Sequence, residues 1–225
     1  MEVISKNFDE EIALKQNMNF TFSKDLIEPH KVQMKAWMEN ADLAIITPAV
    51  AGKFRWLSPR ELEFSPESGF LPSTNYQMAF TDKLLEGAEK KLGLGSSTTF
   101  NFHTEYLKLK TVDIAWVSKE ANPSLQLVLR FNYPVQPKEL KPLLKIMLEG
   151  KSVDYQIVNS DISDELVLDM PEVPESEGKA LKLEVEKGLT TARSEYIAKK
   201  MIFDSAVPVK SSFKILRAVA NVIDS

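Results

Sequence analysis

Hydrophobic and polar residues alternate with a period of two along most of the chain. The alternation is clearest in residues 18–22, 62–64, 99–102, 125–131, 166–168 and 181–185. Successive side chains of a β-strand point to opposite faces, so this pattern predicts strands with one face in a core and the other in solvent. Turn-forming clusters at 65–69, 149–151 and 171–178 separate the strands. Short strands separated in this way predict an all-β protein made of antiparallel β-sandwiches.

Only two segments, residues 82–92 and 137–144, have a pattern that fits a helix better than a strand. Pro137 suits the first turn of a helix, because that position needs no backbone donor, whereas Pro142 prevents the second segment from growing long. We therefore expect little helix, and we expect it in the loops between strands.

A weak internal repeat has a period of roughly a hundred residues, which is the size of one β-sandwich domain. Three pairs of segments align in the same order: 20–26 with 129–135, 61–66 with 165–171, and 76–80 with 181–185. The segments that follow each unit, 105–112 and 212–219, also resemble each other. The repeat predicts two tandem domains, at 1–104 and 105–208, and a linker or the start of a further domain at 209–225.

The charge of the chain is nearly balanced, with 28 Lys and Arg against 32 Asp and Glu and a net charge of -4. Neither sign forms a long block, so the chain lacks the basic surface that attracts nucleic acid or anionic lipid. No run approaches the roughly 18 apolar residues of a membrane span. The start of the chain lacks the features of a signal peptide, and we expect that it was cut from a longer precursor.

The sequence offers little catalytic or metal-binding chemistry. It contains no Cys, which removes disulfides, thiol catalysis and cysteine-ligated zinc. Its only histidines are His30 and His103, which makes a triad or a histidine-rich metal site hard to build. Residues 148–152 resemble the end of a phosphate-binding loop, but Lys145 stands where that loop needs glycine, and strand-like sequence follows. We therefore expect no cofactor, no metal and no enzyme activity.

One stretch is more specific than alternation alone, because it combines glycine, proline and aromatic residues at fixed spacings. It contains Pro48, Gly52, Phe54, Trp56, Leu62, Phe64, Pro66 and Tyr76. Phe54 and Trp56 lie two residues apart and therefore share a strand face. A hairpin turn then brings Leu62 and Phe64 onto the same core face. Gly52 permits a bend where the first strand begins.

These residues form the pattern P-x-V-x-G-x-F-x-W, followed by L-x-F-x-P and L-P-x-T-x-Y. The pattern resembles bacterial Ig-like domains, including an N-terminal domain of bacterial alpha-2-macroglobulin homologues. The second half narrows the choice, because residues 127–135, which include Phe131, and residues 148–153 and 185–189 resemble the next macroglobulin-type domain of those homologues. The resemblance covers nearly the whole chain.

The resemblance implies a role in trapping proteases. In this family, cleavage of a bait segment triggers closure around the attacking protease, and many members capture it through a thioester formed by a Cys-Gly-x-Gln motif. This chain has no Cys and no candidate bait segment, so the implied role is that of non-catalytic structural domains. The implied partners are proteases, through the full-length protein, and other domains of the same chain. The implied location is the periplasm or the cell surface, with a lipid anchor outside this chain.

A second class of function stays open, because an Ig-like adhesin or surface-layer module that binds a polymer or glycan would use the same fold. The three tryptophans bear on this choice. We expect Trp56 in the core and Trp116 on the strand that joins the two domains. We expect Trp37 at the surface. Trp37 and Trp116 are both candidates for docking a neighbouring domain.

Overall fold

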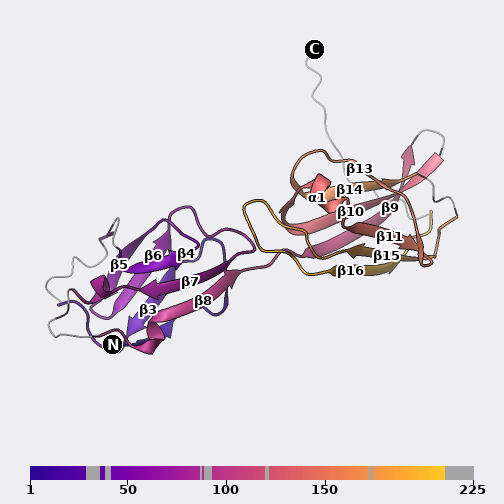
Figure 1. Ribbon diagram of the computed structural model, residues 1–225. Helices are drawn as coiled ribbons and strands as arrows, with labels where there is room; N and C mark the ends of the chain where they lie inside the picture. The colour runs from indigo at the N-terminus through magenta and orange to yellow at the C-terminus, as the bar shows by residue number, and fades with distance from the viewer. Residues whose placement is uncertain are drawn as a thin grey trace, which may run out of the picture. The chain divides into compact units, whose positions relative to one another are not determined.

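The computed structural model describes residues 1–28, 36–38, 42–86, 88, 93–119, 122–171, 173 and 175–210. These residues form sixteen strands, one short α-helix and two 3-10 helices (Figure 1). The fold is all-β and sandwich-like, as the alternating pattern predicts. The chain divides into two compact units, Met1–Tyr106 and Leu107–Ser225.

The first unit contains two four-stranded sheets. Its strands are β1 (Val3–Lys6), β2 (Glu11–Ile12), β3 (Met18–Phe22), β4 (Ala44–Thr47), β5 (Gly52–Ser58), β6 (Glu61–Pro66), β7 (Asn75–Phe80) and β8 (Thr99–Thr104). One sheet has the order β1-β3-β6-β5 and the other the order β2-β8-β7-β4. Neighbouring strands are antiparallel except β2 and β8, which run parallel.

The second unit also contains two four-stranded sheets. Its strands are β9 (Leu109–Lys119), β10 (Asn122–Val135), β11 (Leu144–Leu148), β12 (Lys151–Ser152), β13 (Gln156–Ile157), β14 (Ser163–Met170), β15 (Ala180–Val185) and β16 (Met201–Ala206). The sheets have the orders β13-β14-β10-β9 and β12-β11-β15-β16. All of these neighbours are antiparallel.

The helices are short, as expected. The helix α1 (Pro137–Leu140) forms where a proline at the first turn predicted one, and it connects β10 to β11. The 3-10 helices η1 (Asp82–Leu85) and η2 (Ser96–Thr98) lie between β7 and β8. The helical pattern predicted for 82–92 is thus a 3-10 turn as far as Leu85, and residues 87 and 89–92 of that segment lie outside the described residues.

The two units share one topology. In each, the first, second, fifth and fourth of seven strands form one sheet, and the seventh, sixth and third form the other: β1-β3-β6-β5 with β8-β7-β4, and β9-β10-β14-β13 with β16-β15-β11. This is the arrangement of the constant-type immunoglobulin sandwich. The short strands β2 and β12 are additions at sheet edges.

The strand registers agree with the internal repeat residue by residue. The alignment of the sequence places Phe20 on Leu129 and Leu62 on Leu166. In the structure, Phe20 pairs with Leu62 across β3 and β6, and Leu129 pairs with Leu166 across β10 and β14. The sequence repeat therefore corresponds to an equivalent central strand pair in each sandwich.

The core of the first unit is dominated by phenylalanine. The ring of Phe20 meets the rings of Phe8, Phe80 and Phe100 at centroid distances of 5.6, 4.9 and 5.5 Å. The pairs with Phe8 and Phe80 are edge-to-face and the pair with Phe100 is tilted. Aromatic pairs of this kind add stabilisation beyond the area that they bury. Because these rings come from both sheets and from the loop before β2, they hold the two layers of the sandwich together.

The core of the second unit is mostly aliphatic. Leu127 and Leu129 of β10, Leu168 of β14 and Leu183 of β15 are completely shielded from solvent. Trp116 of β9 is also buried, and its indole Nε1 donates to the carbonyl oxygen of Pro208 at 2.7 Å. That hydrogen bond satisfies the polar atom of the buried ring.

Gly52 lets the ring of Phe64 lie directly against the backbone of β5. A Cβ atom at position 52 would lie 2.4 Å from two ring atoms of Phe64 and 2.6 Å from the carbonyl oxygen of Ser65. Both distances are shorter than a van der Waals contact, and the second is to backbone, which cannot move aside cheaply. Glycine is therefore required here by the close approach of an aromatic ring.

We predict that Gly52→Ala destabilises the first unit by about 1–3 kcal/mol, because the added methyl group overpacks the β5–β6 hairpin. Urea unfolding followed by tryptophan fluorescence measures this change. Gly93→Ala is the matched control, since nothing lies within 4 Å of a Cβ atom there. Equal unfolding midpoints for the two variants would contradict this account.

Tyr76 ties the start of β7 to the preceding loop. Its ring is buried, and its hydroxyl oxygen accepts a hydrogen bond from the backbone N–H of Leu71 at 2.7 Å. Burial raises the pKa of this phenol above its ordinary value. A tyrosine near the start of the sixth strand, bonded to backbone a few residues upstream, is a known corner of immunoglobulin-type sandwiches. The second unit has Leu181 at the equivalent position, so only the first unit has this corner.

We predict that Tyr76→Phe lowers the stability of the first unit by about 1–3 kcal/mol, because the Leu71 amide loses its acceptor in a part-buried site. The free energy of unfolding in urea tests this. Tyr106→Phe removes a hydroxyl that donates to Asn75 at an exposed position, so it should have a smaller effect. A Tyr76→Phe variant as stable as the parent chain would show that the corner contributes nothing.

Candidate functional site

The motif found in the sequence is a set of three cross-strand pairs. Gly52 pairs with Pro66, Phe54 with Phe64, and Trp56 with Leu62, all between β5 and β6. The rings of Phe54 and Phe64 lie 5.0 Å apart at their centroids. These pairs form one edge of the hydrophobic core of the first unit.

The remaining motif residues lie apart from this hairpin. Pro48 is exposed in the loop after β4 and follows a cis peptide bond. Tyr76 lies on β7, in the other sheet of the same unit. Phe131 is buried on β10 in the second unit, so the structure does not bring it together with the others.

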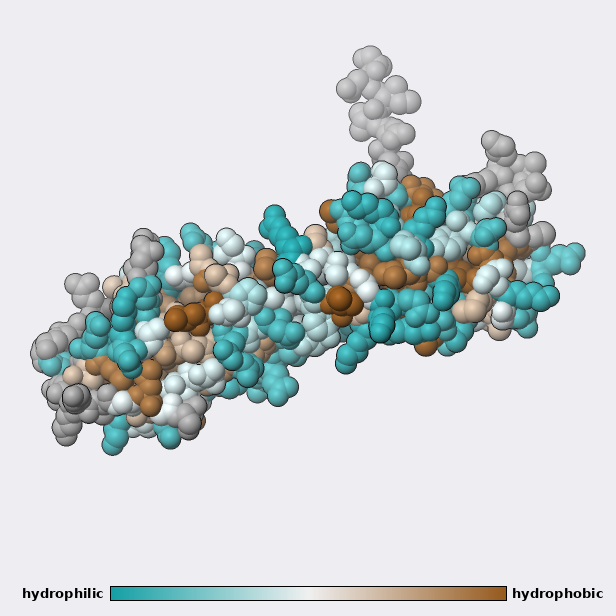
Figure 2. Space-filling model, in the orientation of Figure 1, coloured by the Kyte–Doolittle hydropathy of each residue, from teal (hydrophilic) through white to brown (hydrophobic). Residues whose placement is uncertain are grey.

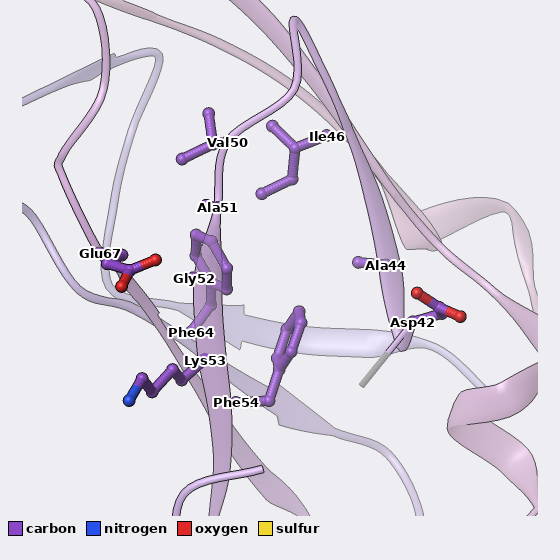
Figure 3. A pocket seen from close by; sticks show the side chains of 10 residues that line it. All are labelled: Asp42, Ala44, Ile46, Val50, Ala51, Gly52, Lys53, Phe54, Phe64 and Glu67. Carbon is purple, nitrogen blue, oxygen red and sulfur yellow. The ribbon is translucent and has the colours of Figure 1, made fainter. Parts of the chain in front are cut away.

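A cavity of about 300 Å³ opens beside the hairpin, between β4 and β5 (Figure 3). Its apolar lining comes from Ala44, Ile46, Val50, Ala51, Phe54 and Phe64, and its charged lining from Asp42, Lys53 and Glu67. The volume is at the lower limit for small-molecule sites, which run from about 300 to 1,000 Å³. Among the described residues, the lining has no imidazole, hydroxyl or thiol group. The apolar part of the lining can contact one apolar side chain.

Trp37 lies on the outer side of the same hairpin. It is 41% exposed, and the Arg55 guanidinium lies 4.3 Å from the centroid of its ring. Arg55 is ion-paired with Glu63, which also accepts a hydrogen bond from Asn17 Nδ2 at 2.8 Å. A cation over one face of an aromatic ring is attracted by it and restrains the ring. The ring is therefore held in place while part of it faces solvent, and its role in docking a domain stays a prediction.

The expectation for Trp116 needs correction. The side chain is 1% exposed, its indole donates to Pro208, and the Lys210 ammonium lies 5.0 Å from the ring centroid. All of these partners belong to the second unit. Trp116 is thus a core residue of that unit, and its ring is not an exposed docking side chain.

No metal or catalytic residues were predicted from the sequence, in which the two histidines are only weak candidates. His103 stacks on Tyr106 with ring centroids 4.2 Å apart, and its Nδ1 lies 3.0 Å from the carbonyl oxygen of Thr104. His30 lies outside the described residues. Among the described residues, no three His, Asp or Glu side chains are placed to hold a metal ion. In the same residues, no helix is both long and apolar enough to span a membrane.

A ladder of ion pairs on the outer face of the second unit was not foreseen from the sequence. Lys182 and Lys200 contact the carboxylate of Glu184 at 2.8 and 2.9 Å, and Lys200 also contacts Glu186 at 3.3 Å. Hydrogen bonds from Lys182 and Lys200 lower the pKa of Glu184 from 4.5 to about 2. Strand alternation places Lys182 and Glu184 on one face of β15, whereas Lys200 reaches them only because β16 pairs with β15.

We predict that the ladder makes the second unit acid-sensitive. Glu184 has a lower pKa in the folded chain than in the unfolded one, so its contribution is complete above pH 4.5 and is lost as the pH falls towards 2. The urea midpoint should therefore fall less between pH 5 and pH 2.5 in Glu184→Gln than in the parent. Glu175→Gln, outside the ladder, should keep the parental dependence. Identical pH profiles for Glu184→Gln and the parent would rule out this role.

Large hydrophobic side chains that reach the surface are scattered. They are Ile4, Trp37, Ile45, Val158, Ile162, Ile197, Ile202 and Val209 among the described residues. On the face that Figure 2 presents, hydrophobic patches are small and separated by hydrophilic residues. Trp37 is the sole aromatic residue in this set, so the described surface has no row of exposed aromatic rings of the kind expected for a glycan platform.

Two immunoglobulin-type sandwiches in tandem define the structural class, and a sequence relative points to a family within it. The chain is 26% identical over 181 residues to an alpha-2-macroglobulin homolog of Yersinia pestis. The match covers 72% of this chain and 9% of that protein, so the chain spans about a tenth of its relative. No family model matches the chain. The similarity supports a distant relationship between this chain and the alpha-2-macroglobulin family.

Comparison with solved structures gives only weak likenesses. L,D-transpeptidase 3 of Mycobacterium tuberculosis has a TM-score of 0.29 at 14% identity over 57% of this chain and 44% of that one. Another L,D-transpeptidase of Mycobacterium tuberculosis also has a TM-score of 0.29, at 13% identity over 72% of each chain. Likenesses this weak carry no argument about function.

Proposed function

We propose that this chain supplies non-catalytic structural domains of a bacterial alpha-2-macroglobulin-like protease trap. The observation that carries the proposal is the match to the Yersinia pestis homolog. That match covers 72% of the chain, which is more than either unit contains, so it includes part of both sandwiches. A resemblance limited to a common Ig-like module would not need to extend across two units.

The placement of the motif supports an architectural role. Its hairpin residues Phe54, Trp56, Leu62 and Phe64 are buried in the core, where they stabilise the fold and meet no solvent-borne substrate. The surface feature beside them, Trp37 on Arg55, is partly exposed and has the chemistry of a protein contact. The sequence has no Cys for a thioester, so in this proposal the capture of a protease depends on parts of the protein outside this chain.

The partners and the location belong to the same proposal. We propose that proteases are met through the full-length protein and that other domains of that protein contact these two. A location in the periplasm or at the cell surface follows from the same role, because a protease trap acts where foreign proteases arrive. In this proposal any lipid anchor lies outside this chain.

We predict that the protein encoded by the complete gene shields a protease such as trypsin. After incubation, trypsin should still cleave a small chromogenic peptide but should lose most of its activity on a large protein such as casein, because a closed frame admits only small substrates. The 225-residue chain alone is the matched control and should leave both activities unchanged.

Three results would contradict the proposal. One is a full-length protein that leaves casein cleavage unchanged. Another is robust turnover of any substrate by the isolated chain, which would show that it is an enzyme. The last is a gene that encodes no more than these 225 residues, since the proposed role requires a larger frame.

A further inference from the structure

The two sandwiches differ at the same side, where an edge strand of one sheet faces an edge strand of the other. In the first unit these strands are β4 and β5, and the cavity of about 300 Å³ opens between them. In the second unit the equivalent strands are β11 and β13, but β12 is added beyond β11. Among the described residues, β4 has no strand added in this way. The second unit therefore shows how the chain covers a gap that is open in the first.

The strand registers identify equivalent positions on the two edges. The equivalent strands β7 and β15 pair with β4 and β11, respectively. By these registers, Ala44 of β4 corresponds to Leu144 of β11. Two residues further along, Ile46 corresponds to Ile146. Both positions of β4 line the cavity, so the backbone beside the cavity can be compared directly between the units.

In the second unit, the backbone carbonyls at both places have hydrogen-bond donors. The Val153 backbone N–H donates to the Ile146 carbonyl oxygen at 3.0 Å. The Tyr155 hydroxyl donates to the Leu144 carbonyl oxygen at 2.9 Å. Residues 151–155, which begin with β12, therefore cover the edge of β11 with one backbone donor and one aromatic side chain.

In the first unit, the same edge is open. The Thr81 backbone N–H donates to the Leu43 carbonyl oxygen at 2.9 Å. Hydrogen-bonded positions alternate in an antiparallel ladder, so β7 next bonds to Ile45, and the backbone groups of Ala44 and Ile46 point away from β7. Within the described ranges, no hydrogen bond reaches these groups. Such an edge can accept an added strand.

The side chain that crosses the gap in the second unit also has no counterpart in the first. The registers of β5 with β6 and of β13 with β14 place Gly52 at the position of Tyr155, which directly precedes β13. Figure 3 shows Gly52 on one side of the cavity and Ala44 and Ile46 on the other. Because glycine has no side chain to cross the gap, an aromatic ring from elsewhere can enter it.

We propose that this cavity binds an extended peptide, which adds to β4 as a strand and places one aromatic side chain between β4 and β5. A backbone N–H of the peptide donates to the Ile46 carbonyl oxygen, and a tyrosine hydroxyl donates to that of Ala44. The aromatic ring packs against Phe54 and Phe64 in the cavity lining. The proposal does not depend on the proposed function of the chain, because it rests on the comparison of the two units.

The charges around the cavity and its size define the expected ligand and affinity. Asp42 is ion-paired with Lys83, and the remaining charged lining is Lys53 and Glu67. These charges balance, so a peptide without net charge fits. One strand and one side chain bury far less than the roughly 800 Å² per partner of a stable complex, so the affinity is low. We expect a dissociation constant on the order of hundreds of micromolar.

A peptide titration tests the proposal. The probe is the acetylated and amidated pentapeptide Lys-Ser-Val-Asp-Tyr, which copies residues 151–155 and has no net charge. It is added to ¹⁵N-labelled chain up to about 5 mM, well above the expected dissociation constant. We expect saturable amide shifts confined to β4, the start of β5 and the loop between them. Shifts centred on another surface, or no saturable shift, would overturn the proposal.

A substitution that fills the cavity provides the second arm. Ala44→Leu gives β4 the side chain of the equivalent second-unit position and should weaken binding about tenfold, because the added atoms take the place of the ring. Ala79→Leu, which pairs with Ile45 on the outer face of the same sheet, is the matched control and should bind as the parent does. Circular dichroism and the urea midpoint check that both variants are folded. Equal weakening by both variants, or by neither, would count against this site.

Three further ligands separate the parts of the proposal without altering the protein. A pentapeptide with glycine in place of tyrosine should bind about tenfold more weakly, because it lacks the anchor. A pentapeptide methylated at the valine nitrogen should also bind about fivefold more weakly, because it lacks the donor to Ile46. Equal binding by either peptide would refute strand addition with an aromatic anchor. Binding of p-cresol as tight as that of the pentapeptide would reassign the cavity to small molecules and overturn the proposal.

Discussion

The pairing of the second strand with the fifth is the constraint on which each sandwich depends. In the first unit it joins Phe20 to Leu62, and in the second it joins Leu129 to Leu166. All four side chains are completely buried. Because a strand has a period of two, a slip of one residue in this pairing would turn the apolar side chains of the slipped strand to solvent. The register of this pair therefore decides which residues reach the core and which reach each outer face.

Much of the fold could be predicted from the sequence, because the features that determine it are periodic. Alternation predicted strands. The repeat aligned 20–26 with 129–135 and 61–66 with 165–171, and these segments contain the equivalent central strands of the two units. The structure also has features that periodicity does not show. Residues 105–112 resembled a strand joining two domains, yet β9 begins at Leu109 and forms a long hairpin with β10 in the second unit. Its partner lies next in the chain, and local alternation does not identify a partner.

The candidate site could be predicted less well than the fold. The spacing of Gly52, Phe54 and Phe64 does reflect a real arrangement, since the ring of Phe64 needs a residue without Cβ beside it. The same reasoning misplaced Trp116. The sequence pattern of a tryptophan in a strand does not show whether its indole N–H bonds to water or to a buried carbonyl such as that of Pro208. The side-chain contacts on the outer faces of the sheets could not be predicted from the sequence. Side chains from neighbouring strands form these contacts, and which side chains are neighbours depends on the strand register.

The attachment of residues 207–210 has a mechanical consequence. Among the described residues, the edge strand β16 pairs only with β15, so tension applied just beyond its last residue would break its hydrogen bonds one at a time. Two hydrogen bonds attach the residues that follow this strand. The Trp116 indole donates to the Pro208 carbonyl oxygen, and the Lys210 backbone N–H donates to the Glu177 carboxylate at 3.0 Å. A pull on the chain beyond Lys210 would therefore load the hydrogen bonds to Glu177 and Trp116 before it reached β16. Tension on the polypeptide would thus meet a bond to the interior of the sandwich before it met the edge strand.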